Sequence, residues 1–126
     1  ICTNDLGLEY TLESATKKTV DGKNVADITF TVTNHTNQDL YDFQLTTGNA
    51  RDNNDVEYNY MGISLNGYNF QTGIATKLRQ SATQQYTVRI ENVKPNAKTF
   101  SFKLFCSAND YPFGDYKVAF NDIAVR

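Results

Sequence analysis

The sequence is poor in the residues that carry most enzyme and metal chemistry. Its 126 residues include no tryptophan, two prolines, two cysteines and a single histidine. A Ser–His or Cys–His nucleophile pair would have to use that one imidazole, and two distant cysteines do not provide the close-spaced ligands of a zinc site. No cofactor-binding motif is present either. We therefore predict a protein that is not an enzyme, with no catalytic residues, no metal and no cofactor.

Neither an excess of basic charge nor a long apolar run is present. Twelve Lys and Arg residues against fourteen Asp and Glu residues give a formal net charge of −2. Binding to nucleic acid depends on a basic surface that neutralises phosphates, so we predict no nucleic-acid partner. The apolar runs are far shorter than the ~20 residues of a membrane-spanning helix, so we predict no membrane span. The length fits a single domain over residues 1–126.

The composition and periodicity are those of a β-protein. The chain has fifteen Thr, fourteen Asn and only four Glu residues, and apolar and polar residues alternate with a period of two, as in half-buried strands. No stretch repeats apolar residues with the period of a helix. The alternating segments are residues 8–13, 26–33, 41–46, 56–60, 86–90, 100–106 and 116–125. We predict an all-β, antiparallel β-sandwich of about seven to eight strands.

The inward positions of the clearest strands predict one core. Its expected members are Ile28, Phe30, Val32, Val88, Ile90, Phe102, Leu104 and Phe120. Turn residues predict a hairpin turn within residues 17–24, centred on Asp21-Gly22, and a loop from Gly48-Asn49 through Asp55. Asn121-Asp122 indicates a bulge in the last strand. Residues 61–73 are rich in Gly and Asn and carry no clear strand pattern.

Four aromatic residues lie in this middle region, where the core pattern is weakest: Tyr58, Tyr60, Tyr68 and Phe70. Exposed tyrosines beside asparagines can stack on a sugar ring or anchor a protein partner. Tyrosine is also common on ordinary strands. We predict these four residues as the candidate ligand-binding set.

Two further segments have both a structural and a chemical interpretation. Residues 52–57 place oxygen ligands close together but lack the glycine and the distal glutamate of an EF-hand loop, so we predict a loop without a calcium ion. His35 lies in the turn Asn34-His35-Thr36, which we predict to be on the surface. The same three residues match the acceptor pattern for N-glycosylation.

Cys2 and Cys106 allow three interpretations. A disulfide between them would close a loop of about 100 residues and reduce the entropy of the unfolded chain. Cys2 could instead carry the lipid of a bacterial lipoprotein, although Ile1 would then have to be removed. The two residues could also be unrelated thiols. We predict the Cys2–Cys106 disulfide and keep the other two interpretations open.

Several of these segments also match a known family pattern. They are a "TFTVTN" strand at residues 29–34, the spacing Ala50-x-Asp52-x-x-Asp55-x-x-Tyr58, residues 88–93, and a last strand ending Phe120-x-x-Ile123-x-Val125. In these segments the chain resembles the immunoglobulin-like domains of unknown function found in exported bacterial proteins and lipoproteins, which are related to a secreted mycobacterial antigen. Asp55 stands where that family usually has glycine. The resemblance implies an immunoglobulin-like sandwich, an extracytoplasmic location (cell envelope, periplasm or secreted), often a lipid anchor, and no catalytic residues.

Two hypotheses for function follow. The first is a non-enzymatic, secreted or envelope-associated module that contacts a protein partner through the loops at one end of the sandwich. The alternative is a carbohydrate-binding module in which the four aromatic residues contact a glycan.

Overall fold

The computed structural model describes residues 2–3, 7–108 and 116–125, and every regular element in these residues is a strand. The strands are β1 (Cys2–Thr3), β2 (Leu8–Val20), β3 (Lys23–Asn34), β4 (Leu40–Asp52), β5 (Glu57–Tyr58), β6 (Met61–Leu65), β7 (Tyr68–Gln71), β8 (Gly73–Leu78), β9 (Thr83–Glu91), β10 (Thr99–Ala108) and β11 (Tyr116–Ala124). Among the residues described, no helix has the length and hydrophobicity needed to cross a lipid bilayer.

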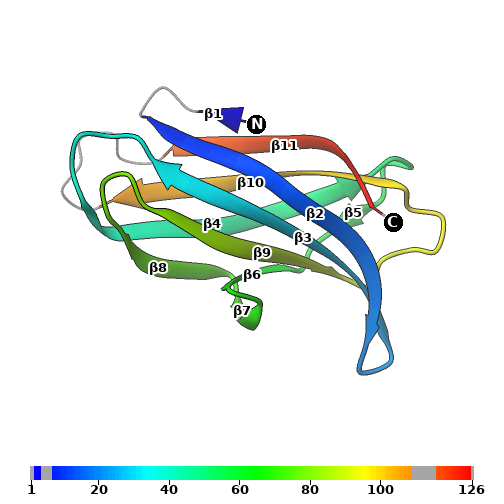
Figure 1. The fold of residues 1–126 in the computed structure, drawn as a ribbon. Coiled ribbons are helices and arrows are strands. Elements are labelled where there is room, and N and C mark those ends of the chain that lie inside the picture. Colours follow the sequence, from blue (N-terminus) through cyan, green and yellow to red (C-terminus); the bar gives the residue numbers. More distant parts are fainter. Residues whose placement is uncertain (1, 4–6, 109–115, 126) are drawn as a thin grey trace.

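The strands form two antiparallel sheets that pack face to face. Sheet A has the order β1-β2-β3-β9-β6-β7, and sheet B has the order β11-β10-β4-β5, with β8 also paired to β4. Figure 1 shows the two layers, with β2, β3 and β9 in one and β4, β10 and β11 in the other. The predicted antiparallel sandwich is therefore confirmed, and its strands are longer and more numerous than the sequence pattern indicated.

The predicted core is confirmed. All eight of its expected members are buried between the sheets. Phe102 and Phe120 from sheet B stack with ring centroids 5.0 Å apart, and Phe120 lies 5.3 Å from Phe30 of sheet A. Because these rings meet at the middle of the sandwich, they fix which residues of each strand face inward.

The hairpin between β2 and β3 turns at the predicted residues but is tighter than expected. Asp21 and Gly22 have φ angles of 52° and 79°, as a two-residue type I′ turn requires. We expected residues 17–24 to form the turn. Instead, the β2–β3 ladder continues up to the pair Val20 and Lys23, and only Asp21 and Gly22 turn.

Two other expectations about loops need correction. β4 runs through the predicted break at Gly48-Asn49 and ends only at Asp52. Gly48 is accommodated in the strand because a Cβ atom there would lie 3.3 Å from the ring of Phe105, so the aromatic ring of the neighbouring strand fills the space of the missing side chain. Residues 61–73, which had no assignment, supply β6 and β7 to sheet A. The bulge at Asn121-Asp122 is present, since two residues of β11 there oppose Ser101 of β10.

A row of contacts crosses the outer face of sheet A. Arg89 on β9 donates two hydrogen bonds of 2.8 Å to the buried carboxylate of Asp27 on β3, and these bonds raise the pKa of the guanidinium. Lys18 on β2 lies 3.4 Å from the same carboxylate. The guanidinium also lies 4.2 Å from the ring of Phe70 on β7. Gly62 on β6 leaves room for this ring, because a Cβ atom there would lie 3.0 Å from the Cβ atom of Phe70.

We expect Phe30→Ala to lower the free energy of unfolding by about 3 to 5 kcal/mol, because it removes the ring that joins the two sheets and leaves a cavity. Urea unfolding of the wild type and the variant would measure this loss. Tyr41→Ala is a suitable control, since the Tyr41 ring is exposed and its removal should change stability by less than about 0.5 kcal/mol. An unchanged unfolding midpoint for Phe30→Ala would contradict the prediction.

Candidate functional site

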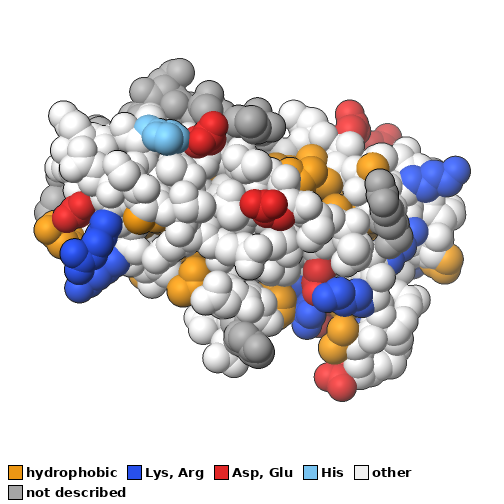
Figure 2. Space-filling view, viewed as in Figure 1, with side chains coloured by type: hydrophobic (Ala, Val, Ile, Leu, Met, Phe, Trp, Pro, Cys, Tyr) orange, Lys and Arg blue, Asp and Glu red, His pale blue; other side chains and the backbone are white. Residues whose placement is uncertain are grey.

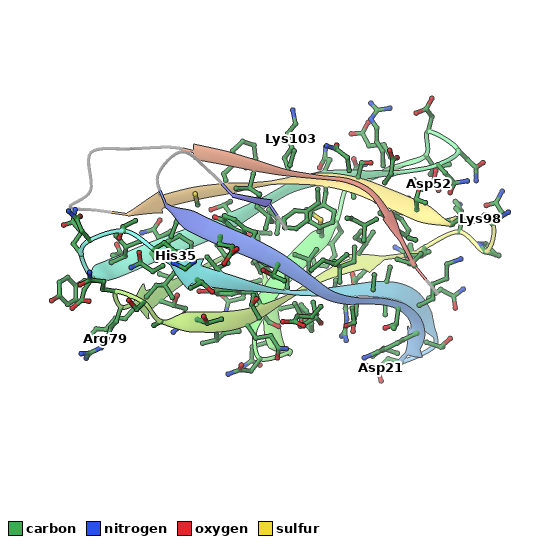
Figure 3. All side chains as sticks on the ribbon, turned by 45° about the horizontal axis from the view of Figure 1, so that its top comes forward. Asp21, His35, Asp52, Arg79, Lys98 and Lys103 are labelled. Atoms are coloured by element: carbon green, nitrogen blue, oxygen red, sulfur yellow. The ribbon has the colours of Figure 1, made fainter. Side chains whose placement is uncertain are left out.

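Three connections meet at one end of the sandwich, which we call the hairpin end. They are the β2–β3 turn, residues 53–56 between β4 and β5, and residues 92–98 between β9 and β10. Figure 3 shows Asp21, Asp52 and Lys98 at this end. His35 and Arg79 lie at the opposite end in the same view. Backbone and side-chain hydrogen bonds join the three connections: Val93 N donates to Asn24 O at 3.0 Å, and Asn54 Nδ2 donates to Asn96 O at 3.3 Å.

Asp52 organises the connection between β4 and β5. Its carboxylate is 7% exposed and accepts hydrogen bonds from the backbone N–H groups of Asn54 (2.8 Å) and Val56 (3.0 Å) and from the hydroxyl of Tyr58 (2.8 Å). Asp55 takes the left-handed conformation, with φ of 61°, at the position where glycine was expected. Asp52 is therefore a loop-forming group, as the sequence predicted. Among the described residues, no group of three or more His, Cys, Asp or Glu side chains is close enough to hold a metal ion.

Asn53 attaches this loop to the start of β10. Its side-chain oxygen accepts hydrogen bonds from the backbone N–H groups of Lys98 (2.7 Å) and Thr99 (3.3 Å). The loop is therefore held on two sides by side-chain contacts, and its conformation is set before any ligand binds.

Tyr58 does not take part in an exposed aromatic platform, which corrects the prediction for this residue. It is 5% exposed, and its ring lies 5.4 Å from that of Phe100 in the core. Its hydroxyl donates to Asp52 and accepts from the backbone N–H of Lys94 at 3.1 Å. Burial and the neighbouring Asp52 carboxylate raise the pKa of the Tyr58 hydroxyl. Tyr58 thus couples the loop of residues 53–56 to that of residues 92–98.

The other predicted aromatic residues are divided among different surroundings. Tyr60 is 44% exposed at the hairpin end. Phe70 lies on the outer face of sheet A, beside the guanidinium of Arg89. The side chain of Tyr68 lies outside the described residues. Of the described members, Tyr60 alone is an exposed aromatic ring.

Two hollows open at the hairpin end, each with a volume of about 310 Å³. The first, which we call the lysine hollow, is lined by Lys17, Lys18, Thr19, Asn24, Val25, Val93, Lys94 and Pro95. The second, which we call the tyrosine hollow, is lined by Val56, Glu57, Tyr58, Asn59, Tyr60, Glu91, Asn92 and Lys94. Lys94 lines both. Sequence reasoning missed the lysine hollow, because only the fold brings the Lys17-Lys18 pair of β2 next to the Lys94-Pro95 turn.

His35 and the glycosylation pattern lie far from this end. His35 is exposed, as predicted, and its Nε2 atom is 3.0 Å from Glu9 Oε1; Figure 2 shows the histidine beside an acidic side chain on the surface. Asn34 is 0% exposed, and its amide nitrogen donates to the carbonyl oxygens of Gln38 and Leu78. A buried and hydrogen-bonded amide is not accessible for glycosylation in the folded protein.

Cys106 is a buried thiol near the hydroxyl of Tyr10. Burial raises the pKa of this thiol, and the hydrogen bond with Tyr10 only partly opposes the rise. The backbone of Cys2 pairs with that of Tyr10 in sheet A, whereas its side chain lies outside the described residues. The strand register therefore places the backbone of Cys2 opposite the residue that contacts Cys106, and the disulfide stays a prediction.

The comparisons with known proteins identify the fold and no family. No family model and no curated protein matches the chain. Among solved structures, the ASH/PapD-like domain 7 of human CEP192 is similar over 96% of this chain and 84% of that chain, with 12% identity and a TM-score of 0.50. A family 123 glycoside hydrolase from Clostridium perfringens aligns with 93% of this chain but 28% of its own chain, with 9% identity and a TM-score of 0.49. The chain is thus an immunoglobulin-like antiparallel β-sandwich.

The Asp52 contacts predict an acid-sensitive loop. Burial alone would raise the pKa of the Asp52 carboxyl group, but the hydrogen bonds from Tyr58, Val56 and Asn54 outweigh it and lower the pKa. A carboxyl pKa that is lower in the folded state stabilises the fold above the unfolded pKa of about 3.9, and this contribution is lost as the pH falls through the folded value. We expect Asp52→Asn to cost about 1 to 3 kcal/mol at pH 7, and to cost less at pH 2 to 3. Urea unfolding at both pH values measures this difference.

The control for this experiment is Asp55→Asn, because Asp55 is an exposed carboxylate of the same loop and asparagine also tolerates its backbone conformation. It should have little effect at either pH. Equal losses at pH 7 and at low pH for Asp52→Asn would show that its ionisation does not stabilise the loop.

The disulfide prediction can be tested by mass spectrometry on protein recovered from an oxidising environment. The protein is denatured and treated with an alkylating reagent, with and without prior reduction. The bridge predicts two adducts after reduction and none without it. Denaturation is needed because Cys106 is buried and would react slowly in the folded protein even as a free thiol. Two adducts without reduction would eliminate the bridge.

Proposed function

We propose that the protein is a non-enzymatic binding module that contacts a protein partner through the hairpin end of the sandwich. The observation that carries the proposal is the way this end is built: the side chains of Asp52, Asn53 and Tyr58 lock the loops to one another, and the exposed ring of Tyr60 lies beside them. Preformed loops lose little conformational entropy on binding. Exposed tyrosines are frequent anchors in protein interfaces.

The positions of Cys106 and His35, the thiol and the imidazole that could act as nucleophile and base, support the non-enzymatic part of the proposal. The thiol of Cys106 is buried and its pKa is raised, whereas reactive cysteines are accessible and have lowered pKa values. His35 lies on the surface at the opposite end and contacts Glu9. The extracytoplasmic location belongs to the same proposal and is supported by the sequence resemblance to exported domains.

A second candidate, glycan binding, is favoured by the lining of the tyrosine hollow. Asn59, Asn92, Glu57 and Glu91 line the same hollow as the exposed Tyr60. An aromatic face bordered by amides and carboxylates can stack on a sugar ring while hydrogen bonding to its hydroxyl groups. The sequence predicted a glycan-binding set of four aromatic residues. In the structure, glycan binding at the tyrosine hollow depends on Tyr60 alone among the described members of that set.

Paired tyrosine variants test the protein-binding proposal. Tyr60 and Tyr41 are both exposed, at 44% and 64%, and Tyr41 lies near the start of β4, at the end opposite to Asp52. Envelope and secreted proteins of the source organism are passed over immobilised wild type and variants, and any partner is purified and its affinity measured. We expect Tyr60→Ala to weaken that affinity by about tenfold or more, and Tyr41→Ala to leave it unchanged.

Equal affinities for Tyr60→Ala and the wild type would contradict binding through the hairpin end. A glycan array with the same three proteins separates the second candidate. Tyr60-dependent glycan binding without any protein partner would favour the carbohydrate-binding module.

A further inference from the structure

The lysine hollow concentrates positive charge on a chain whose net charge is −2. Three lysines line it, Lys17 and Lys18 on β2 and Lys94 in the loop after β9. No acidic residue is among its lining residues in the described part of the chain. Figure 2 shows lysine and arginine side chains in several places at this end of the molecule.

The Asp27 carboxylate, which Lys18 of this hollow approaches, is already neutralised. Asp27 receives both hydrogen bonds of the Arg89 guanidinium at 2.8 Å, and Lys18 approaches it only to 3.4 Å. The single charge of Asp27 is therefore matched by Arg89, and Lys18 adds a further positive charge. Two further carboxylates lie near this group, since Glu91 pairs with Val25 in the ladder and both Glu91 and Asp21 interact with Arg89. Four cations (Lys17, Lys18, Lys94 and Arg89) against three anions leave an excess of one positive charge.

Two of the three lysines have no carboxylate partner. The ammonium of Lys17 contacts the carbonyl oxygen of Pro95 at 3.4 Å. Within the described residues, neither Lys17 nor Lys94 forms an ion pair within 4.0 Å. These two groups are therefore available to bind an anion without breaking an existing salt bridge.

The walls of the lysine hollow combine this charge with apolar surface. Val25 and Val93 line it but are almost fully buried, so the exposed Pro95 supplies most of the accessible apolar surface among these three residues. The bond from Val93 N to Asn24 O fixes the two walls relative to each other. A ligand that fits this lining carries a negative group next to a small apolar group, which describes an acidic peptide segment better than a free inorganic ion.

The sign of the charge changes from one hollow to the next. Glu57 and Glu91 line the tyrosine hollow, and Lys94 lies between the two. Glu57 is paired with Arg51 at 3.4 Å, whereas Glu91 forms no ion pair within 4.0 Å among the described residues. A long polyanion crossing this end would meet the Glu91 carboxylate, and like-charge contacts disfavour such partners. A short acidic segment confined to the lysine hollow avoids that repulsion.

We infer that the lysine hollow binds an acidic peptide segment, with Lys17 and Lys94 contacting a carboxylate and Pro95 contacting an adjacent apolar side chain. The inference rests on the proposed function in that the segment belongs to the protein partner. It adds the chemistry of the partner, which the proposed function leaves open.

The test uses two synthetic peptides and needs no identified partner. One contains glutamates on both sides of a leucine, and the other has glutamine in place of each glutamate. Titration into isotope-labelled protein, followed by NMR, should give saturable shifts at the amides of Lys17, Asn24 and Lys94 with the acidic peptide. Binding should weaken as salt is raised, because exposed charges are screened.

Charge-removing variants locate the binding. We expect Lys17→Gln and Lys94→Gln each to weaken binding of the acidic peptide by about tenfold. Lys77→Gln is the matched control, because it removes the same charge from β8, outside the lining of the lysine hollow, and should leave binding unchanged. Urea unfolding of each variant confirms that the fold is intact. Glu91→Gln should bind as tightly as the wild type or more tightly, since it removes a neighbouring negative charge.

Three results would overturn the inference: equal binding of the glutamine peptide, unchanged binding by the Lys17→Gln and Lys94→Gln variants, or displacement of the acidic peptide by equimolar inorganic phosphate, which would assign the hollow to small anions. Failure of the inference and failure of the proposed function give different results. If peptide binding fails while a partner still depends on Tyr60, the inference alone is wrong. If peptide binding holds and Tyr60→Ala has no effect on a partner, the proposed anchoring at Tyr60 is wrong.

Discussion

The contact of aromatic rings across the two sheets is the constraint on which the rest of the structure depends. Phe102 and Phe120 extend from sheet B and meet Phe30 of sheet A, and Phe30 stacks in turn on Tyr86 with centroids 5.7 Å apart. Strands have a side-chain period of two, so once these rings face inward, every neighbour on their strands faces outward. A slip of one residue would expose the rings and bury threonines. The register of both sheets therefore follows from this cluster.

The same register determines which side chains lie on the outer surface of sheet A. Because Ile28 faces the core, Asp27 faces outward, and its partner Arg89 on β9 lies directly opposite on the same face. The resulting ion pair is mostly shielded from solvent and extends to Phe70 on β7. A pair in this position contributes little net stability by itself, but removing one member would leave an unpaired buried charge. It also engages Asp27, so this carboxylate does not pair with Lys17 or Lys94 of the lysine hollow.

The sequence predicted what depends on local pattern and missed what depends on distant contacts. Alternation was sufficient to place the core, and the turn-forming pair Asp21-Gly22 was sufficient to place the hairpin turn, since both signals lie in neighbouring residues. Gly48 was assigned to a loop because glycine usually interrupts strands, and only the ring of Phe105 on another strand explains why β4 continues. Tyr58 was predicted to be exposed because the contacts that bury it are also not visible in the neighbouring sequence. Its hydroxyl contacts Asp52 and Lys94, which come from two separate loops.

The hairpin end combines an ordered framework with exposed functional groups, and the two properties have different physical origins. Its order comes from polar side chains that hydrogen bond within the fold, as those of Asp52 and Tyr58 do. Its capacity to bind comes from side chains such as Lys17 and Lys94, which have no partner of opposite charge among the described residues. A binding surface needs both, because mobile lysines on mobile loops would lose more entropy on association than their contacts return. At the hairpin end, carboxylate and hydroxyl groups therefore lock the loops, and the ammonium groups of Lys17 and Lys94 remain available for a ligand.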